Sequence, residues 1–209
     1  MQNKYNYILW DFDGVIINSD KARIAGFIEA LKYFPQNQID LLLTFHSENG
    51  GLSRYVKFRY FFEKIRKEEV EKQTILEYAK TFSTIMKTLL IDKNLLMNQT
   101  LEFIKKNHNK FDMHIVSGSD GNELRFLCKA LEIDHYFKSI SGSPKPKNDL
   151  VKNLVDKDII IRSESCLIGD SINDFEAAEI NCLDFMGFNN PSLALHGVKY
   201  ITTFDEFNK

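Results

Sequence analysis

The alternation of short strand-like and helix-like segments in the second half of the chain constrains the fold most. From residue 111 onward, short apolar stretches rich in β-branched and aromatic residues are separated by stretches with helical periodicity. Strands are predicted at residues 111–116, 138–141, 166–168, 183–186 and 200–202, and helices at 123–131, 147–155 and 174–180. Repeated β-α units of this kind are typical of a parallel sheet with helices on both faces.

A long helical insertion interrupts this pattern near its start. A first strand is predicted at residues 5–10, but the next strand signal comes only at residue 111. One helix is predicted to begin after Ser19, which would be its N-cap. Further helices are predicted at residues 53–66, 68–90 and 97–107. A βαβ crossover needs only about a dozen residues, so the excess must form a unit of its own. We therefore predict an α/β core of residues 1–17 and 96–209, and an all-helical cap domain of residues 18–95.

Acidic residues follow the predicted strands at the points where those strands end. Asp11 and Asp13 follow the first strand, and Asp170 and Asp174 follow the strand at 166–168. In open α/β sheets ligands bind at the carboxyl ends of the strands, so these side chains are expected to converge. Each aspartate alone is as well explained by the capping of a turn or helix. Convergent carboxylates repel one another, and an all-oxygen set without His or Cys favours Mg²⁺ as the compensating ion.

Three of these segments resemble motifs of the haloacid dehalogenase superfamily. Residues 11–15, Asp-Phe-Asp-Gly-Val, resemble its first motif; residues 115–117, Ile-Val-Ser, resemble its second; residues 169–174, Gly-Asp-Ser-Ile-Asn-Asp, resemble its fourth. The helical insertion follows the first motif, where the helical (C1-type) cap of that family lies. The resemblance implies a Rossmann-like core and points to the branch of phosphoglycolate phosphatase and β-phosphoglucomutase.

The resemblance also implies catalytic roles for the first motif. Asp11 becomes the nucleophile that attacks phosphorus and carries an aspartyl phosphate. Asp13 becomes the general acid that protonates the leaving oxygen, and then the base that activates water. A halide leaves unprotonated, so an acid at position 13 favours a phosphatase over a dehalogenase.

The remaining motifs supply phosphate and metal ligands. Ser117, with the backbone at Gly118, is expected to bind the non-bridging oxygens of the phosphoryl group. The expected ligands of Mg²⁺ are the Asp11 carboxylate, the Asp13 backbone carbonyl and Asp170, with Asp174 acting through water or a neighbouring group.

Two lysines compete for the third motif, a phosphate-binding lysine before a helix. Lys145 lies in a Lys-Pro-x-x-Asp pattern, which resembles the phosphoglycolate phosphatase and β-phosphoglucomutase branch. Lys147 ends a Gly-Ser-Pro-x-x-Lys pattern that suits other members. We favour Lys145 and keep Lys147 as the alternative.

Substrate choice is expected to reside in the cap, because a lid contacts the leaving group and excludes water. The loop at residues 46–54 contains Gly51 and Arg54, our two candidates for substrate contact. The alternative is an ordinary interhelical turn followed by a solvated basic face. Structural roles are expected for His46, His114, and the cap-packing set Tyr55, Phe58, Phe61 and Phe62.

Composition argues against several other classes of function. The formal net charge is -2, so the chain has no general attraction for nucleic acid or an anionic membrane. Three widely spaced cysteines and no CxxC pair argue against a disulfide framework or zinc ribbon. The sequence shows no signal peptide and no apolar run of membrane-spanning length. We therefore expect a cytoplasmic protein, a monomer or weak homo-oligomer, whose partner is a small phosphorylated substrate.

Together these features predict a Mg²⁺-dependent phosphatase for a small phosphorylated metabolite, such as a sugar phosphate or a phosphoglycolate-like acid. One alternative is a phosphomutase of the β-phosphoglucomutase type, which uses the same residues. Another is a signalling domain switched by a phosphorylated Asp. The Asp-x-Asp spacing and the helical insertion both count against the signalling domain.

Overall fold

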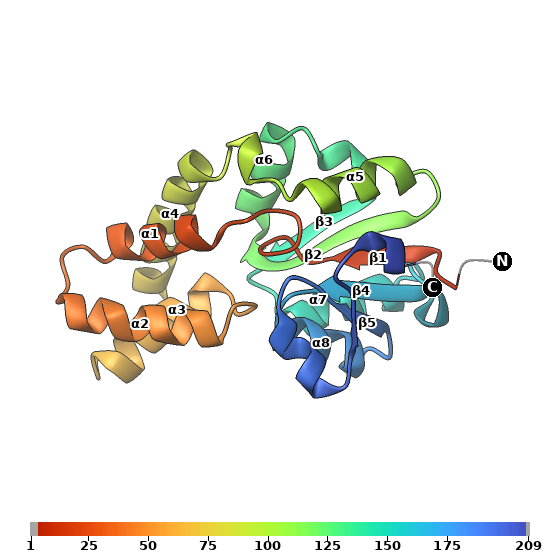
Figure 1. Ribbon diagram of the computed structural model, residues 1–209. Coiled ribbons are helices and arrows are strands. Elements are labelled where there is room, and N and C mark those ends of the chain that lie inside the picture. Colours follow the sequence, from red (N-terminus) through yellow and green to blue (C-terminus); the bar gives the residue numbers. More distant parts are fainter. Residues whose placement is uncertain (1–3, 208–209) are drawn as a thin grey trace.

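The computed structural model of the chain describes residues 4–207, so residues 1–3 and 208–209 of the predicted core lie outside the description. Within that range the core contains a six-stranded sheet in the order β3-β2-β1-β4-β5-β6 (Figure 1). All neighbouring strands pair in parallel. The strands are β1 (Tyr7–Trp10), β2 (Asp112–Asp120), β3 (Ser139–Ser143), β4 (Ser165–Gly169), β5 (Asp184–Gly187) and β6 (Lys199–Tyr200). The predicted α/β parallel-sheet class is confirmed.

Strand β1 lies at the centre of the sheet, between β2 and β4. Its sequence, Tyr-Ile-Leu-Trp, is apolar throughout, as is typical of a strand covered on both faces. Trp10 pairs with Ile115 of β2 and Ile168 of β4. The chain after Trp10 and the ends of β2 and β4 therefore lie at the same edge of the sheet.

Two apolar clusters cover the two faces of the sheet. Helices α5 (Asn98–Asn107) and α6 (Gly121–Ala130) lie on one face, and α7 (Lys147–Asp156) and α8 (Ile172–Ile180) on the other (Figure 1). Ile8 and Trp10 belong to the first cluster and Leu9 to the second, as the alternation of side chains along a strand requires.

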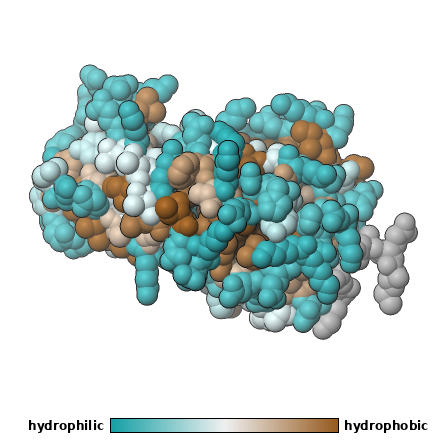
Figure 2. All heavy atoms as spheres, turned by 90° about the horizontal axis from the view of Figure 1, so that it is seen from above, coloured by the Kyte–Doolittle hydropathy of each residue, from teal (hydrophilic) through white to brown (hydrophobic). Residues whose placement is uncertain are grey.

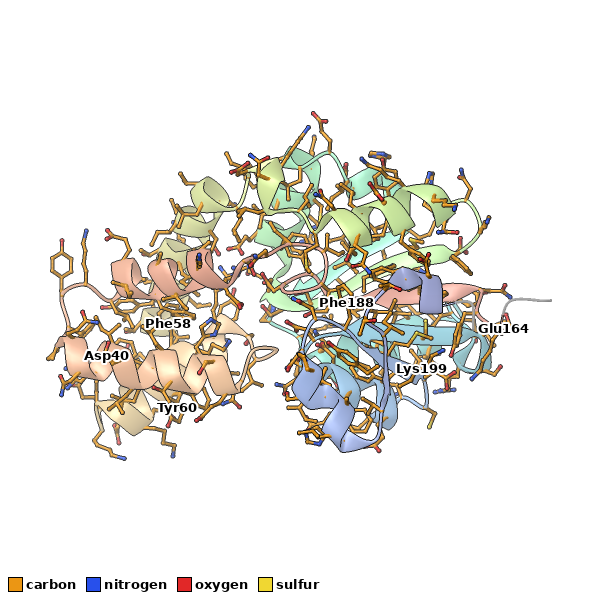
Figure 3. The ribbon with its side chains drawn as sticks, viewed as in Figure 1. Asp40, Phe58, Tyr60, Glu164, Phe188 and Lys199 are labelled. Carbon is orange, nitrogen blue, oxygen red and sulfur yellow. The ribbon has the colours of Figure 1, made fainter. Side chains whose placement is uncertain are left out.

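The cap residues form a helical lobe beside the sheet. Its helices are α1 (Asp20–Ala30), α2 (Gln36–Glu48), α3 (Arg54–Tyr60), a π-helical turn at Phe61–Ile65, and α4 (Lys72–Leu89). The side chains of Phe58, Phe61 and Phe62 are buried, and Tyr55 packs against the apolar cluster that contains them, so the expected aromatic packing of the cap is confirmed. Figure 3 shows Phe58 between the cap helices.

The two connections between cap and core run side by side. Ile17 forms an antiparallel bridge with Leu96. The amide of Asn18 donates to the carbonyl of Leu95, and that of Met97 to Ile16. This bridge supports the proposed division of the chain at residues 17 and 96.

Several element bounds differ from the sequence expectations. Strand β2 continues to Asp120, beyond the predicted end at 116, because its pairing with β3 resumes after an irregularity at Ser117. The helix predicted at 53–66 changes to a π-turn after Tyr60, and α4 begins at Lys72 rather than 68.

The surface seen from above is largely hydrophilic, with smaller hydrophobic patches (Figure 2). Among residues 4–207, no helix combines the length and the apolar character needed to cross a membrane.

Candidate active site

Three carboxylates meet where β1 and β4 end. Oxygens of Asp11, Asp170 and Asp174 lie within 4.8 Å of one another. Asp11 follows β1, Asp170 follows β4, and Asp174 lies in the first turn of α8. The loop after β1 lies so close to Asp170 that a Cβ at Gly14 would stand 1.8 Å from its Oδ2, and Gly14 has a φ of +73°. Glycine is therefore required at position 14 for both space and backbone conformation.

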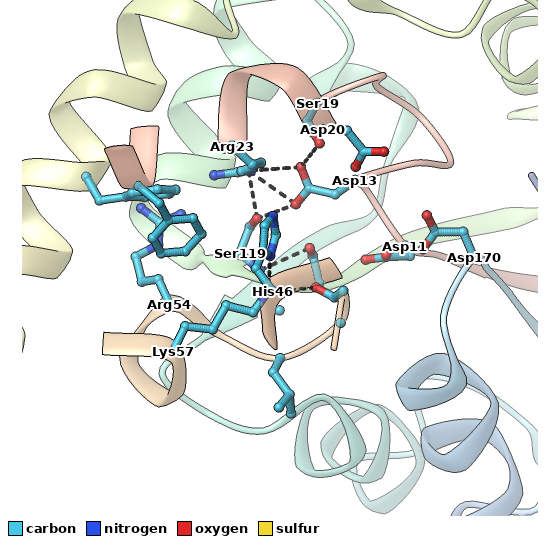
Figure 4. Close-up of a pocket in the computed structure, with 17 residues that line it drawn as sticks. Asp11, Asp13, Ser19, Asp20, Arg23, His46, Arg54, Lys57, Ser119 and Asp170 are labelled. Atoms are coloured by element: carbon cyan, nitrogen blue, oxygen red, sulfur yellow. Dashed lines mark hydrogen bonds and ion pairs between the residues drawn. The ribbon is translucent and has the colours of Figure 1, made fainter. Parts of the chain in front are cut away.

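The carboxylate of Asp13 faces the cap and does not join this group. Its oxygens accept hydrogen bonds from Ser19 Oγ at 2.5 Å, Ser119 Oγ at 2.5 Å and Arg23 Nη2 at 3.0 Å (Figure 4). Burial favours a raised pKa for Asp13, but the charge of Arg23 and these hydrogen bonds outweigh it and lower the pKa to about 2. The expected convergence of four carboxylates therefore holds for three.

Ser19 was predicted as a helix N-cap, but its side chain binds Asp13. It occupies the N-cap position of α1, but its hydroxyl makes no capping hydrogen bond to the helix. It donates instead to Asp13, so the residue predicted to start the helix also holds a candidate catalytic group.

Lys147, rather than Lys145, reaches the carboxylates. Its Nζ lies 2.9 Å from Asp11 Oδ1 and also forms an ion pair with Asp174. Burial would lower the pKa of Lys147, but the charges of Asp11 and Asp174 raise it. Lys145 is exposed to solvent, two residues earlier in the loop. Our preference for Lys145 is therefore corrected: the first residue of α7 points to the strand ends and the loop residue does not.

The buried carboxylates retain an excess of negative charge. Burial and the neighbouring carboxylates raise the pKa of Asp11 to about 7 and that of Asp170 to about 9. Asp11 Oδ1 is buried, and among residues 4–207 the ammonium of Lys147 is its close partner. Three carboxylates beside one lysine, with oxygen donors only, fit a hard divalent cation such as Mg²⁺.

Asp174 also holds the start of α8. Its Oδ2 accepts hydrogen bonds from the Ser171 backbone N–H at 3.0 Å and from Ser171 Oγ at 2.7 Å, which forms a capping box. Its other oxygen contacts Lys147. Because both oxygens already have partners, Asp174 is better placed to orient Lys147 than to bind an ion by itself.

Strand β2 supplies the predicted phosphate-binding residues. Ser117 is buried at the sheet edge, and its Oγ accepts a hydrogen bond from the Ser119 backbone N–H at 3.2 Å. A Cβ at Gly118 would stand 2.2 Å from the Gly51 carbonyl oxygen, so the cap loop lies directly on the backbone of β2. Gly51 and Gly118 thus mark a contact between cap and core that tolerates no side chain.

Arg54 is buried but already has an anionic partner. Its guanidinium contacts both oxygens of Glu123, at 2.5 and 2.7 Å, and donates to Ser83 at 2.7 Å. Glu123 also accepts from Arg23 at 2.7 Å, and its side chain is fully buried in α6. One carboxylate of the core therefore binds two arginines of the cap. Arg54 lines the cavity, but its charge is already balanced by Glu123, so its contact with substrate stays a prediction.

A second buried cation of the cap lies close by. Lys57 Nζ lies 2.7 Å from His46 Nδ1 and 3.2 Å from the Gly50 carbonyl oxygen. Burial, with Arg23 and Arg54 nearby, lowers the pKa of Lys57 to about 7 although Asp13 and Asp170 oppose the shift. Burial and the charge of Lys57 lower the pKa of His46 to about 3, so this ring is neutral.

Many of these groups surround one small cavity between cap and core, while Lys147, Asp174 and Glu123 lie behind its wall. Its volume is about 70 Å³ (Figure 4). Core residues on its wall include Asp11, Asp13, Ser117, Gly118 and Asp170, and cap residues include Arg23, His46, Gly51, Arg54 and Lys57. The cavity joins the strand ends to the cap loop, as the sequence predicted.

Arg23 and Glu123 are the residues that sequence reasoning missed. Each lies within an amphipathic helix, where a charged residue is usually solvated. Their partnership spans 100 positions in the chain, and that of Arg54 with Glu123 spans 69. A pattern within one segment cannot reveal such pairs. Ser119 did have a signal, because it belongs to the Ser-Gly-Ser that follows the predicted strand.

Comparison with solved structures identifies the same fold in several proteins. CbbY from Rhodobacter sphaeroides in complex with xylulose-(1,5)bisphosphate aligns with a TM-score of 0.76 at 15% identity, covering 97% of this chain and 96% of that one. β-Phosphoglucomutase from Clostridium difficile gives 0.75 at 12%, with 97% and 92% covered. A predicted phosphoglycolate phosphatase from Haemophilus somnus 129PT gives 0.72 at 19%, with 99% and 92% covered. At these identities the likeness concerns the fold.

The sequence comparisons give the family. No curated protein matches this chain in sequence. A family model described as haloacid dehalogenase-like hydrolase matches residues 8–187, a range that contains the carboxylates, Lys147 and the whole cap. The chain therefore belongs to the haloacid dehalogenase-like hydrolase family, and the resemblance of its motifs is confirmed.

Proposed function

We propose that this hydrolase is a Mg²⁺-dependent phosphatase that transfers the phosphoryl group of a small phosphorylated metabolite to Asp11 and then to water. One observation carries the proposal: Asp11 lies buried at the end of the central strand, beside Lys147 and Asp170 and on the wall of the cavity. A carboxylate in that position can act as a nucleophile only if nearby cations neutralise the charge of the phosphoryl group.

The cluster of aspartates at the strand ends would hold the metal ion. Asp11 and Asp170 supply carboxylate oxygens, the Asp13 backbone carbonyl is a further candidate ligand, and Asp174 supports the site through Lys147. When bound, Mg²⁺ offsets the repulsion between the Asp11 carboxylate and the phosphoryl oxygens.

The first half-reaction forms a bond between an Asp11 oxygen and phosphorus while the bond from phosphorus to the leaving oxygen breaks. The leaving oxygen takes a proton from Asp13. Lys147 and Ser117, with the backbone at Gly118, neutralise or donate to the non-bridging oxygens. In the second half-reaction water attacks the phosphorus, Asp13 accepts a proton, and Asp11 is released as a carboxylate.

Asp13 as held here suits the second half-reaction. Its contacts with Arg23, Ser19 and Ser119 favour the ionised form that accepts a proton from water. Donation to the leaving oxygen requires a protonated Asp13, so this carboxyl must leave Arg23 during the first half-reaction. Motion of α1, which carries Arg23, is a direct way to release it.

The proposal is tested with a panel of phosphomonoesters assayed with Mg²⁺ and with EDTA. We expect hydrolysis that depends on Mg²⁺, is abolished by Asp11→Asn, and passes through a phosphoryl group on residue 11 detectable by acid quench and mass spectrometry. Hydrolysis that survives Asp11→Asn would refute the role of Asp11.

The same assay separates the alternatives. A phosphomutase would require a sugar bisphosphate for turnover and would return the phosphoryl group to a sugar. A phosphorylated Asp11 that persists for minutes would favour a signalling domain. Asp13 and the helical cap offer the acid, the base and the enclosure that both enzymes need, so they favour the phosphatase and the mutase over the signalling domain. The bisphosphate requirement then separates the phosphatase that we propose from the mutase.

A further inference from the structure

Lys57 is a buried cation of the cap with no carboxylate partner. Only 3% of its surface is exposed. Among residues 4–207, no ion pair is formed by Lys57, whereas Arg23, Arg54 and Lys147 each bind a carboxylate. Its two close contacts, His46 Nδ1 and the Gly50 carbonyl oxygen, are neutral acceptors.

Such a residue is unfavourable for stability. Moving a charge from water into a protein interior costs several kcal/mol unless an opposite charge compensates it. The lowered pKa of Lys57 expresses that cost. A methionine of similar shape would fill the same space without a charge, so packing alone gives no reason for a lysine here.

The buried cations on the cap side of the cavity outnumber the carboxylates that bind them. Arg23 and Arg54 are bound by Asp13 and Glu123, whereas Lys57 is not. Asp20 also lines the cavity, but it is exposed to solvent and forms no ion pair among residues 4–207. Both carboxylates are engaged by the arginines. The unbalanced positive charge therefore lies on Lys57.

The ammonium group of Lys57 also has a free donor. It carries three N–H groups, of which one is directed at His46 Nδ1 and one at the Gly50 carbonyl. The third is available to a molecule in the cavity, whose wall Lys57 shares with Asp11 and Ser117. Figure 4 shows the Lys57 side chain running from the cap toward the middle of the cavity, beside His46.

We propose that Lys57, positioned by His46 and Gly50, binds a carboxylate on the leaving-group side of a short phosphomonoester. This rests on the proposed function, because it assigns Lys147 and Ser117 to the transferred phosphoryl group. One unbalanced charge and one free N–H match a monoanion better than a second phosphate. The volume of the cavity, about 70 Å³, further favours a compact molecule. The selective residue of the cap is then Lys57 rather than Arg54.

The test compares two probes that differ only in the carboxylate, 2-phosphoglycolate and 2-hydroxyethyl phosphate. Binding of each is measured by calorimetry with Mg²⁺ in the Asp11→Asn protein, with and without Lys57→Met. We expect the Asp11→Asn protein, the parent in this test, to bind 2-phosphoglycolate more tightly than 2-hydroxyethyl phosphate. Adding Lys57→Met should weaken the binding of 2-phosphoglycolate about tenfold or more and leave the binding of 2-hydroxyethyl phosphate nearly unchanged. Lys64→Met, at an exposed lysine of the same cap segment, should change neither.

Other outcomes overturn the proposal. If Lys57→Met weakened the binding of both probes equally, Lys57 would bind the phosphoryl group. If it weakened the binding of neither probe, or if the parent bound both probes equally well, Lys57 would be a structural residue. The proposed function is judged separately, by turnover in the protein with Asp11 intact. A melting temperature of Lys57→Met at or above that of the parent shows that any lost binding does not come from unfolding.

Discussion

On the core side of the cavity three carboxylates surround one lysine, whereas on the cap side two carboxylates bind two of three buried cations and leave Lys57 without an ion pair among residues 4–207. The two sides thus carry opposite charge imbalances. The core side is suited to a divalent cation and the cap side to an anion. Under our two proposals, a phosphorylated acid with its metal ion would balance the charges on both sides.

The largest effect is expected on the core side, from Lys147→Met. Loss of the lysine leaves Asp11 and Asp174 buried without a cation, which should lower the free energy of unfolding by ~3–5 kcal/mol in EDTA. It also removes a phosphate ligand, so kcat/KM should fall by at least about a hundredfold with Mg²⁺ present. Urea denaturation and steady-state kinetics measure the two.

Lys145→Met is the matched control for this prediction. Lys145 is exposed, so its substitution should change the free energy of unfolding by no more than about 0.5 kcal/mol and leave kcat/KM nearly unaltered. If Lys145→Met were the more damaging of the two, the assignment of the third motif to Lys147 would be wrong.

The next effect concerns Glu123, the core carboxylate that binds two arginines of the cap. Glu123→Gln removes the charge that binds Arg23 and Arg54. It should lower the free energy of unfolding by ~3 kcal/mol, because buried Arg54 loses its carboxylate and Arg23 keeps only Asp13. Urea denaturation measures this, with Glu102→Gln at an exposed site of α5 as control. An equal effect of the two substitutions would contradict the buried network.

A smaller effect is expected from Arg23→Met on the pH dependence of phosphoenzyme hydrolysis. Asp13 acts as base in its ionised form, so the rate should fall as pH drops through its pKa. With Arg23 present that pKa is about 2, and the fall lies below the range in which the protein is assayed. Without Arg23 the pKa should rise, and the acid limb should enter the measurable range above about pH 4.

Single-turnover measurements at several pH values test this. Lys21→Met, at an exposed lysine on the same helix, should retain the pH profile of the parent. An unchanged acid limb in Arg23→Met would show that Arg23 does not set the ionisation of Asp13.

The smallest effect is a change of stability with pH on the cap side. The pKa of Lys57 is about 7 in the folded protein and near its ordinary value of 10.5 when unfolded. Between those values the unfolded chain binds more protons, so the contribution of Lys57 to stability rises with pH and is lost as pH falls through 7. The melting temperature of Lys57→Met should exceed that of the parent by a few degrees near pH 6.5, and the difference should shrink toward pH 10. A difference independent of pH would mean that Lys57 is not a buried cation.

Local pattern predicted much of the core side. An apolar strand followed by an acid is visible within one short segment of sequence, and parallel strands bring their carboxyl ends to one edge. The sequence pattern therefore predicted the convergence of Asp11, Asp170 and Asp174, although it placed Asp13 with them and the structure does not. The choice between Lys145 and Lys147 does not, because it depends on which residue opens α7 and faces the sheet.

The sequence by itself determined the parallel sheet, the helical insertion and the family, because these depend on periodicity and on motifs contained in single segments. Only the tertiary structure decided which charges meet. Glu123 neutralises Arg54 from 69 positions away, and Lys57 is left as a buried cation of the cap that has no ion pair among residues 4–207. Charged residues on amphipathic helices look alike in sequence, and their roles differ only once the fold has buried some of them and supplied partners to others.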